Sequence, residues 1–287
     1  MEFNYTEAFS RNIGWLTENE QHTLANKRVA IAGLGGVGGS HLLTLARLGI
    51  GQFNISDLDT FELANMNRQA GASMSTLNQN KIDVLERMAT DINPELNINK
   101  FSNGVTLENL DEFLDGVDVY IDGLDFFQLD IRRAVFKACY DKGIPTITAA
   151  PIGMGTALLV FLPGKMSFDD YFQLVGYSET EQYIRFLAGL APSMMHASYI
   201  ADQSRVDFEN KKGPSTPMAC DFCAGIAATQ ALKLLLKRGK VVAAPYGLHF
   251  DAYKNKLKKT WRPMGNNNPL QRVLIQIIKG KLANSKR

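Results

Sequence analysis

Residues 28–38 read Arg28-Val-Ala-Ile-Ala-Gly33-Leu-Gly35-Gly36-Val-Gly38, and this stretch decides the fold. The run from Arg28 to Gly33 indicates a buried strand, and Val37 to Leu48 indicates a helix that stops at Gly49. Glycines between a strand and a helix allow a tight turn and a close approach of backbone to phosphate, while the helix N-terminus supplies N–H donors. The motif predicts a nucleotide site, and it fits NAD, FAD or ATP equally well.

Strand-like and helical segments alternate on both sides of this motif. Alternation of this kind is typical of βαβ units, so we predict an α/β fold with a mostly parallel, Rossmann-like sheet and helices on both faces. The predicted parallel strands are 28–33, 52–57, 96–101, 117–122 and 144–149, and the further helices are 77–92 and 128–142. An antiparallel extension is expected from a strand at 155–162 and a hairpin at 246–251 and 256–261.

No linker divides the chain, so we expect residues 1–287 to form a single domain with a substrate-side insertion at about 163–219. Within it, Ser178 and Glu181 have the spacing of a capping box. A helix is expected over 219–237. Pro269 is expected to begin a last helix with one apolar stripe. That stripe consists of Leu270, Val273, Leu274, Ile277 and Ile278.

Composition limits the class of protein. With 45% hydrophobic and 21% charged residues, the chain is expected to bury a core and not to be disordered. The N-terminus is too polar for a signal peptide, no apolar run approaches the ~20 residues of a membrane span, and three cysteines do not make a disulfide framework. We therefore expect a cytoplasmic protein without a membrane partner.

Charge is unevenly distributed along the chain. After Asp251 there are ten Lys or Arg and no acidic residue, whereas 29 acidic residues face 21 basic ones before that point. We interpret residues 252–287 as a basic tail that complements an acidic body, although a tail of this kind also suits nucleic acid.

Arg68, Lys81 and Asp125 favour a triphosphate over a dinucleotide, whereas Asp57 suits the ribose of either. Asp57 closes the second strand, where an acidic side chain can bind ribose. Arg68 can fork onto phosphate oxygens, and Lys81 lies in the first turn of a helix, a poor place for a cation unless an anion is near. Asp125 follows a strand at the carboxyl edge of the sheet, where a carboxylate beside phosphates suits Mg²⁺.

The stretch from Asp57 to Gln69 resembles the Asp-x-Asp…Ser-Asn-Leu-x-Arg-Gln motif of the ThiF/MoeB/HesA family of E1-like, ubiquitin-activating-type adenylating enzymes. The glycine loop, Lys81, Asn93-Pro94 and Asp125 also fit that family in order and spacing. The similarity covers roughly residues 5–162 and resumes at 219–238. It implies an E1-like adenylation fold.

The resemblance also implies roles for individual residues. The nucleotide would be bound by Gly33, Gly35, Gly36, Gly38, Asp57, Asp59, Asn65, Arg68, Gln69 and Lys81. Asp125 would coordinate Mg²⁺. Arg11 resembles the N-terminal arginine that relatives extend into the ATP site of the neighbouring subunit, which implies a homodimer. The residues expected to act in catalysis are Arg68, Lys81, Asp125 and Arg11.

The chain departs from the family at several positions. Many relatives bind structural zinc through two Cys-x-x-Cys pairs, but only Cys220-Asp-Phe-Cys223 is present, so we expect no structural zinc. Cys139 is expected in the core, and a nucleophilic role for Cys220 or Cys223 is the minor alternative. Phe126 replaces the asparagine that usually follows the metal-binding aspartate, and Arg132 or Arg133 is expected to stand in for a nearby family arginine.

Together these features predict an ATP-dependent adenylyltransferase. It would activate the carboxylate of a ubiquitin-like or sulfur-carrier-like protein, or of a peptide, as an acyl-adenylate. The basic tail gives slight weight to a carboxylate carried on tRNA. Two alternatives stay open: an NAD(P)-dependent oxidoreductase and a non-catalytic nucleotide-binding module. Arg68, Lys81 and Asp125 argue against both.

Overall fold

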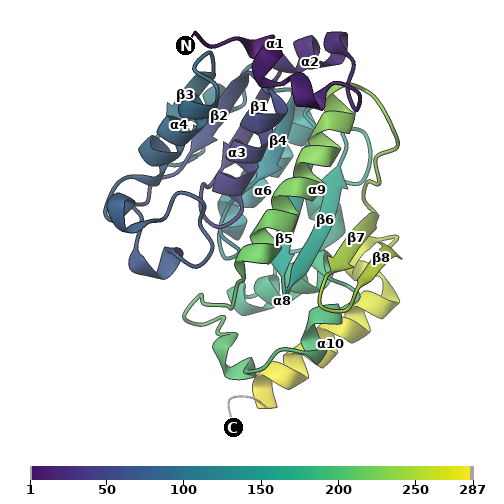
Figure 1. Cartoon of the computed structure of the whole chain (residues 1–287). Coiled ribbons are helices and arrows are strands. Elements are labelled where there is room, and N and C mark those ends of the chain that lie inside the picture. Colours follow the sequence, from purple (N-terminus) through teal and green to yellow (C-terminus); the bar gives the residue numbers. More distant parts are fainter. Residues whose placement is uncertain (1, 285–287) are drawn as a thin grey trace.

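A computed structural model of the chain describes residues 2–284, and Ser285–Arg287 of the basic tail lie outside the described residues (Figure 1). One eight-stranded sheet runs through the molecule in the order β3-β2-β1-β4-β5-β6-β7-β8. The first five strands of this order, β3, β2, β1, β4 and β5, are parallel to one another. The pairs β5–β6, β6–β7 and β7–β8 are antiparallel. The strands are β1 (Arg28–Ala32), β2 (Gln52–Ser56), β3 (Asn97–Phe101), β4 (Val119–Asp122), β5 (Thr146–Ile152), β6 (Gly155–Phe161), β7 (Tyr246–Asp251) and β8 (Lys256–Trp261).

The longer helices follow the sequence prediction closely in place. The α-helices are α1 (Tyr5–Ala8), α2 (Glu18–Ala25), α3 (Gly38–Leu48), α4 (Lys81–Ile92), α5 (Leu110–Phe113), α6 (Leu129–Lys142), α7 (Phe168–Phe172), α8 (Glu179–Leu190), α9 (Pro217–Leu235) and α10 (Pro269–Asn284). The 3-10 turns are η1 (Ser10–Asn12), η2 (Leu63–Asn65), η3 (Met74–Thr76), η4 (Met195–Ser198), η5 (Gln203–Arg205) and η6 (Gly265–Asn267). The predicted α/β architecture and the antiparallel extension are confirmed.

Alternation along the buried strands produces two core layers. In β1, Val29 and Ile31 pack into the layer beneath α2, α3, α4 and α9, whereas Ala30 and Ala32 face the layer beneath α5, α6, α7 and α8. Small residues on the second face leave room for aromatic rings such as Tyr120 and Phe136, whose ring centroids are 5.6 Å apart. Helices therefore cover both faces of the sheet from β3 to β6, and Figure 1 shows α3 and α9 on the near face with α6 behind.

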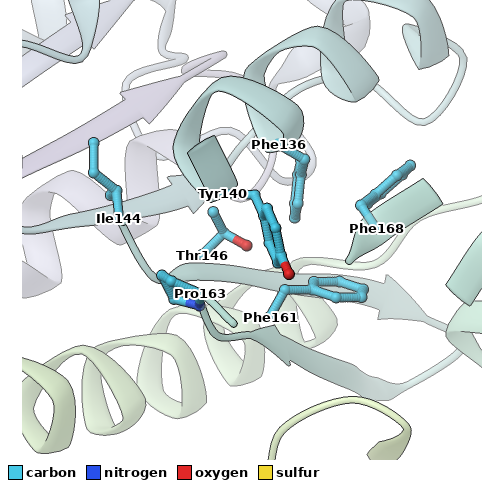
Figure 2. A pocket seen from close by; sticks show the side chains of 7 residues that line it. All are labelled: Phe136, Tyr140, Ile144, Thr146, Phe161, Pro163 and Phe168. Atoms are coloured by element: carbon cyan, nitrogen blue, oxygen red, sulfur yellow. The ribbon is translucent and has the colours of Figure 1, made fainter. Parts of the chain in front are cut away.

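The second layer contains a small hollow between α6, β5 and β6. Aromatic rings of Phe136, Tyr140, Phe161 and Phe168 surround it, and Thr146 also lines it (Figure 2). Its volume is about 10 Å³, which is close to the room that one water molecule needs. A hollow of this size in an aromatic layer is a packing feature and does not accommodate a nucleotide.

Helix α4 begins four residues later than the predicted start at Leu77. Residues 77–80 instead pair with the chain before η2: the Phe61 amide donates to the Gln79 carbonyl at 3.0 Å, and the Asn78 amide donates to the Phe61 carbonyl at 2.9 Å. Apolar spacing extended the predicted helix through Leu77, but these two bonds divert the backbone, and Lys81 becomes the first helical residue.

Two expectations about helix packing were wrong in detail. Ser178 caps α8, but the carboxylate of Glu181 pairs with Arg185 and Lys279 instead of closing a capping box. In α10 the predicted stripe is divided: Ile278 is buried against α8, together with Ile275. Leu270, Val273 and Ile277 are exposed. The rotation of α10 is fixed by buried Gln271, whose amide donates to the Ala188 carbonyl at 2.9 Å.

Helix α9 is the part of the described chain that is long and apolar enough, at 19 residues, to cross a membrane. No apolar run of that length was expected from the sequence. Half of its apolar stretch is buried, and it packs on α3, β5 and β6. Because a core helix passes the same test of length and composition, these contacts favour a packing role for α9.

Candidate functional site

The glycine loop lies where the order of the parallel strands reverses, between β1 and β4. From β1 the chain continues to β2 and β3 on one side, and β4 and β5 lie on the other side. In sheets of this kind ligands bind outside the carboxyl ends of the strands at such a point. Gly33 has φ +82°, and a Cβ on it would lie 2.4 Å from the carbonyl oxygen of Gly123 after β4. A Cβ on Gly38 would lie 1.8 Å from the Gly33 carbonyl oxygen. These contacts allow only glycine, and they press the loop against the end of β4.

The outer part of the loop faces three side chains from other segments. A Cβ on Gly36 would lie 3.3 Å from Cys220 Sγ and 3.4 Å from Arg68 Nε, and one on Gly35 would lie 3.6 Å from Gln69 Nε2. Helix α3 starts at Gly38, so the amides of its first turn lie at the end of the loop, and among them the Gly39 amide donates to the Gly35 carbonyl at 3.4 Å. A phosphate bound by these amides would lie against Arg68.

Asp57 fastens the loop from the end of β2. Its Oδ2 accepts a 2.6 Å hydrogen bond from the Leu34 amide, and its Oδ1 accepts one of 2.9 Å from the Asp59 amide. Burial raises the pKa of the Asp57 carboxyl above its ordinary value, and the two backbone hydrogen bonds oppose that rise. Each carboxylate oxygen has a second lone pair, so Asp57 retains acceptors for a ribose hydroxyl.

A short turn after η2 carries the expected phosphate ligands. The Asn65 carbonyl accepts from the amides of Arg68 and Gln69, and the Asn65 side chain accepts from the Glu62 amide at 3.0 Å. Arg68 donates to the Ala64 carbonyl and to Asn67 Oδ1, and across residues 2–284 it forms no salt bridge. The structure thus brings Arg68 to the glycine loop as a cation without a carboxylate partner. Asn65 holds the turn in place through its backbone carbonyl.

Lys81 has an anionic neighbour within its own chain. Its Nζ lies 3.1 Å from Asp59 Oδ2, and the lysine side chain is largely buried. The position of Lys81 in the first turn of α4 is confirmed, and the anion expected near a cation there is Asp59 of the same chain. Asp59 supplies the compensating charge and links Lys81, through its own amide, to Asp57.

Asp125 lies on the loop after β4, two residues beyond the glycine that contacts Gly33 and Gly38. It is exposed, and its Oδ1 accepts a 3.0 Å hydrogen bond from the Phe127 amide. Its Oδ2 has no hydrogen bond within the part of the chain that the structure describes. Mg²⁺ in nucleotide sites is commonly held by one or two carboxylates with phosphate oxygens and waters. The free carboxylate oxygen of Asp125, on the loop that packs on Gly33, fits that donor set.

The sequence named Arg132 or Arg133 as the arginine near Asp125, and the contact of Cys220 with the glycine loop was not predicted. Arg132 on α6 forms a buried ion pair with Asp122 beneath the Asp125 loop. Arg133 instead forms an ion pair with Asp169, with 2.8 Å between Nε and Oδ1. Cys220, in the first turns of α9, reaches Gly36. Asp122 is the last residue of β4, at the end of a predicted strand.

The cysteines are all buried. Cys139 is in the core as expected, and Cys223 Sγ lies 3.2 Å from Thr156 Oγ1. Burial raises the pKa of the Cys220 and Cys223 thiols above the ordinary value, so neither is a thiolate at neutral pH. This disfavours the nucleophilic alternative for both residues.

Arg11 lies far from the glycine loop of its own chain. The adjacent Asn12 donates to the Leu48 carbonyl at 3.2 Å, and Leu48 is the last residue of α3. An α3 of 11 residues spans about 16 Å, and Figure 1 shows the N-terminal helices at its far end. The structure therefore does not bring Arg11 together with Arg68, Lys81 and Asp125 within one chain.

Comparison with known proteins gives this geometry a context. The tRNA threonylcarbamoyladenosine dehydratase of Bacillus subtilis (strain 168) is 36% identical over 142 residues, which are 49% of this chain and 55% of that protein. The sulfur carrier protein ThiS adenylyltransferase of Escherichia coli (strain K12) is 31% identical, over 50% of this chain and 56% of the relative. Ubiquitin-like modifier-activating enzyme 5 of Drosophila persimilis is 30% identical over 76% of this chain and 54% of its own length. The chain spans about half the length of the curated relatives it matches.

Solved structures share the fold at low identity. A crystal structure of PaaA superposes with a TM-score of 0.67 and 19% identity, over 91% of this chain and 74% of that one. A crystal structure of E. coli MccB with ATP gives a TM-score of 0.66 and 20% identity, over 92% and 72%. The model of the ThiF family matches residues 9–273, which is nearly the whole chain. This protein therefore belongs to the ThiF family.

Proposed function

We propose that this protein is a ThiF-type adenylyltransferase that uses Mg-ATP to activate the carboxylate of a carrier protein or peptide. The observation that carries the proposal is that an uncompensated cation, Arg68, lies against Gly36, while the loop that bears Asp125, a carboxylate with a free oxygen, packs through Gly123 on Gly33. A dinucleotide needs neither group beside its pyrophosphate, whereas a triphosphate that is about to lose pyrophosphate uses both. The adenylyltransferases and the modifier-activating enzyme among the relatives support the same interpretation.

The reaction needs no general base. A terminal carboxyl group has a pKa near ~3.5, so the nucleophile is already ionised at neutral pH. A carboxylate oxygen attacks the α-phosphorus of ATP, the bond from that phosphorus to the bridging oxygen breaks, and pyrophosphate leaves with the bond electrons. The protein must bring two anions together in line and stabilise the charge on the phosphates.

The residues of this chain divide that task. The glycine loop and the first turn of α3 would bind phosphate through amides, Arg68 would neutralise equatorial oxygens, and Asp57 would orient the ribose. Lys81, held beside Asp59, would add positive charge, with Asn65 and Gln69 positioning the turn. Mg²⁺ held by Asp125 would supply neutralisation of the departing pyrophosphate.

We further propose that the enzyme works as a cytoplasmic homodimer. Arg11 is too distant from the glycine loop of its own chain to contact ATP there, so a catalytic role for Arg11 requires a second subunit. The same assembly would make each active site dependent on both chains.

The first test is Mg²⁺-dependent exchange of pyrophosphate into ATP. Candidate carboxylates are peptides and small carrier proteins that end in Gly-Gly, and tRNA carrying a carboxylated base. The tRNA candidate is included because of the Bacillus relative and the ten cations after Asp251. We expect exchange with one of the first two classes and its loss in Asp125→Ala.

Arg68→Ala should lower the rate of exchange by about 100-fold or more, because a charge contact to the transition state is removed. The variant should stay folded. Arg47→Ala changes an exposed arginine of α3 and serves as the matched control. Exchange at the wild-type rate in Arg68→Ala would refute the assigned role. Clear NAD binding without ATP binding would instead support an oxidoreductase, and ATP binding without exchange by any carboxylate would support a non-catalytic module.

A further inference from the structure

A buried ion pair lies directly beneath the loop that carries Asp125. Arg132 Nε on α6 donates to Asp122 Oδ2 at 2.9 Å, and both side chains are only 3% exposed. Asp122 is the last residue of β4, and it also accepts from Thr148 Oγ1 at 2.9 Å. A buried pair of this kind contributes little net stability, because desolvation offsets the attraction.

The guanidinium group extends beyond the pair to the loop backbone. Its Nη2 donates to the Leu124 carbonyl at 2.6 Å and to the Asp125 carbonyl at 3.0 Å, and its Nη1 donates to the Phe126 carbonyl at 3.3 Å. Three successive carbonyls therefore converge on one planar group. The ring of Phe186 on α8 closes the other side, with the guanidinium carbon 4.8 Å from the ring centroid.

Asp122 also binds the loop backbone directly. Its Oδ1 accepts from the Leu124 amide at 3.3 Å, so the ion pair holds both a donor and several acceptors of the loop. The Asp125 carboxylate itself has one hydrogen bond, from the Phe127 amide. The direction in which Asp125 points is consequently set by the backbone, and Arg132 holds that backbone.

We propose that Arg132 is a positioning residue that aims the Asp125 carboxylate at the metal–nucleotide complex. The proposal rests on the metal-binding role proposed above for Asp125. Lysine cannot replace Arg132, because an ammonium group presents three donors from a single point and cannot bridge Asp122 and three carbonyls in one plane. Loss of the fork would leave the glycine loop and Arg68 unchanged and would weaken only the part of ATP binding that depends on the metal.

The test compares ATP affinity with and without a metal, using Mn²⁺ as the probe. Affinity is measured by calorimetry in EDTA and again in Mn²⁺, without any carboxylate substrate, so turnover is not needed. We expect the gain in ATP affinity on adding Mn²⁺ to be about tenfold smaller in Arg132→Lys than in the wild type, the size expected when a charged hydrogen bond is lost. The ATP affinity in EDTA should equal that of the wild type. Arg133→Lys, one residue along α6 and paired at the surface with Asp169, should behave as wild type.

Two further results separate this inference from the proposed function. If Asp125→Asn loses the Mn²⁺-dependent gain while Arg132→Lys keeps it, Arg132 supports the fold alone and the inference is overturned. If Asp125→Asn keeps the gain as well, the metal role proposed for Asp125 fails, and the inference fails with it.

A measurement on the wild-type protein covers the case in which Arg132→Lys does not fold. In protein labelled with ¹⁵N-arginine, the Arg132 Nε–H signal should be protected from exchange by its bond to Asp122. Its chemical shift should change when Mg-ATP is added and not when ATP is added with EDTA. A shift that is identical in both conditions would overturn the proposal.

Discussion

His41, the fourth residue of α3, is fully buried, and within residues 2–284 neither of its ring nitrogens has a hydrogen-bond partner. Burial lowers the pKa of its imidazole to about 3. The pKa of the unfolded chain is near ~6.5, so the folded value is depressed. Stability from the neutral ring is complete above pH ~6.5 and is lost as the pH falls toward the folded pKa.

We therefore predict that acid destabilises the wild-type protein more than His41→Leu. Between pH 7.5 and 5 the free energy of unfolding should fall by about 2 kcal/mol more in the wild type, because one proton binds only the unfolded chain. Urea unfolding at the two pH values measures the difference. His196 and His249 are present in both proteins, so their own titration cancels in the comparison. An equal fall in both proteins would contradict the prediction.

At the same scale, local motifs in the sequence predicted only part of the candidate site. The glycines, Asp57, Arg68 and Asp125 follow predicted strands, so the expected topology was enough to gather them at one edge. Arg132 and Cys220 reach the site from α6 and α9 through contacts that no local pattern encodes. The contact of Lys81 with Asp59 was not predicted for the same reason, since Asp59 is 22 positions earlier in the chain.

Among the elements, the turn from β1 into α3 depends most strictly on glycine, and its positions are not equivalent. The Cβ of an alanine at position 38 would meet a backbone carbonyl at 1.8 Å, which cannot move away. At position 36 it would meet Cys220 Sγ and Arg68 Nε at 3.3 and 3.4 Å, which are side-chain atoms that can shift. The two substitutions should therefore differ in kind.

We predict that Gly38→Ala destabilises the protein by about 3 kcal/mol and abolishes ATP binding, because the turn must open to relieve the overlap. Gly36→Ala should fold normally and weaken ATP binding by a few-fold, of order 1 kcal/mol. Thermal melting and ATP titration measure both effects. Gly280→Ala in α10, where a Cβ would have no neighbour within 4 Å, is the control and should bind ATP as wild type does. Equal effects at positions 36 and 38 would show that the overlap with the Gly33 carbonyl does not govern the turn.

Elements with strong local signals were predicted well, and their ends and rotations were not. Hydrophobic runs between glycines identified β1, β4 and β6 to within one or two residues. The start of α4 depends on hydrogen bonds to Phe61, and the buried side of α10 depends on Gln271 reaching α8. Both are tertiary contacts, and sequence periodicity carries no information about them.

For the whole molecule, the N-terminal segment and the glycine loop are separated by the length of α3. If Arg11 acts in catalysis, it must act in the site of another subunit, and each site then combines Arg11 of one chain with Asp125 of the other. Two defects placed on different chains can in that case complement each other.

We predict that Arg11→Ala and Asp125→Ala are each inactive in pyrophosphate exchange and regain activity when they are unfolded together and refolded as a mixture. Random pairing makes half of the dimers mixed, and each mixed dimer has one intact site, so about a quarter of wild-type activity should return. Arg68→Ala mixed with Asp125→Ala is the matched control, because both residues belong to the site of their own chain and the same mixed dimer has no intact site. Recovery in the control would mean that Arg68 also crosses between subunits. No recovery in the first mixture, with dimers present, would place Arg11 outside the active site.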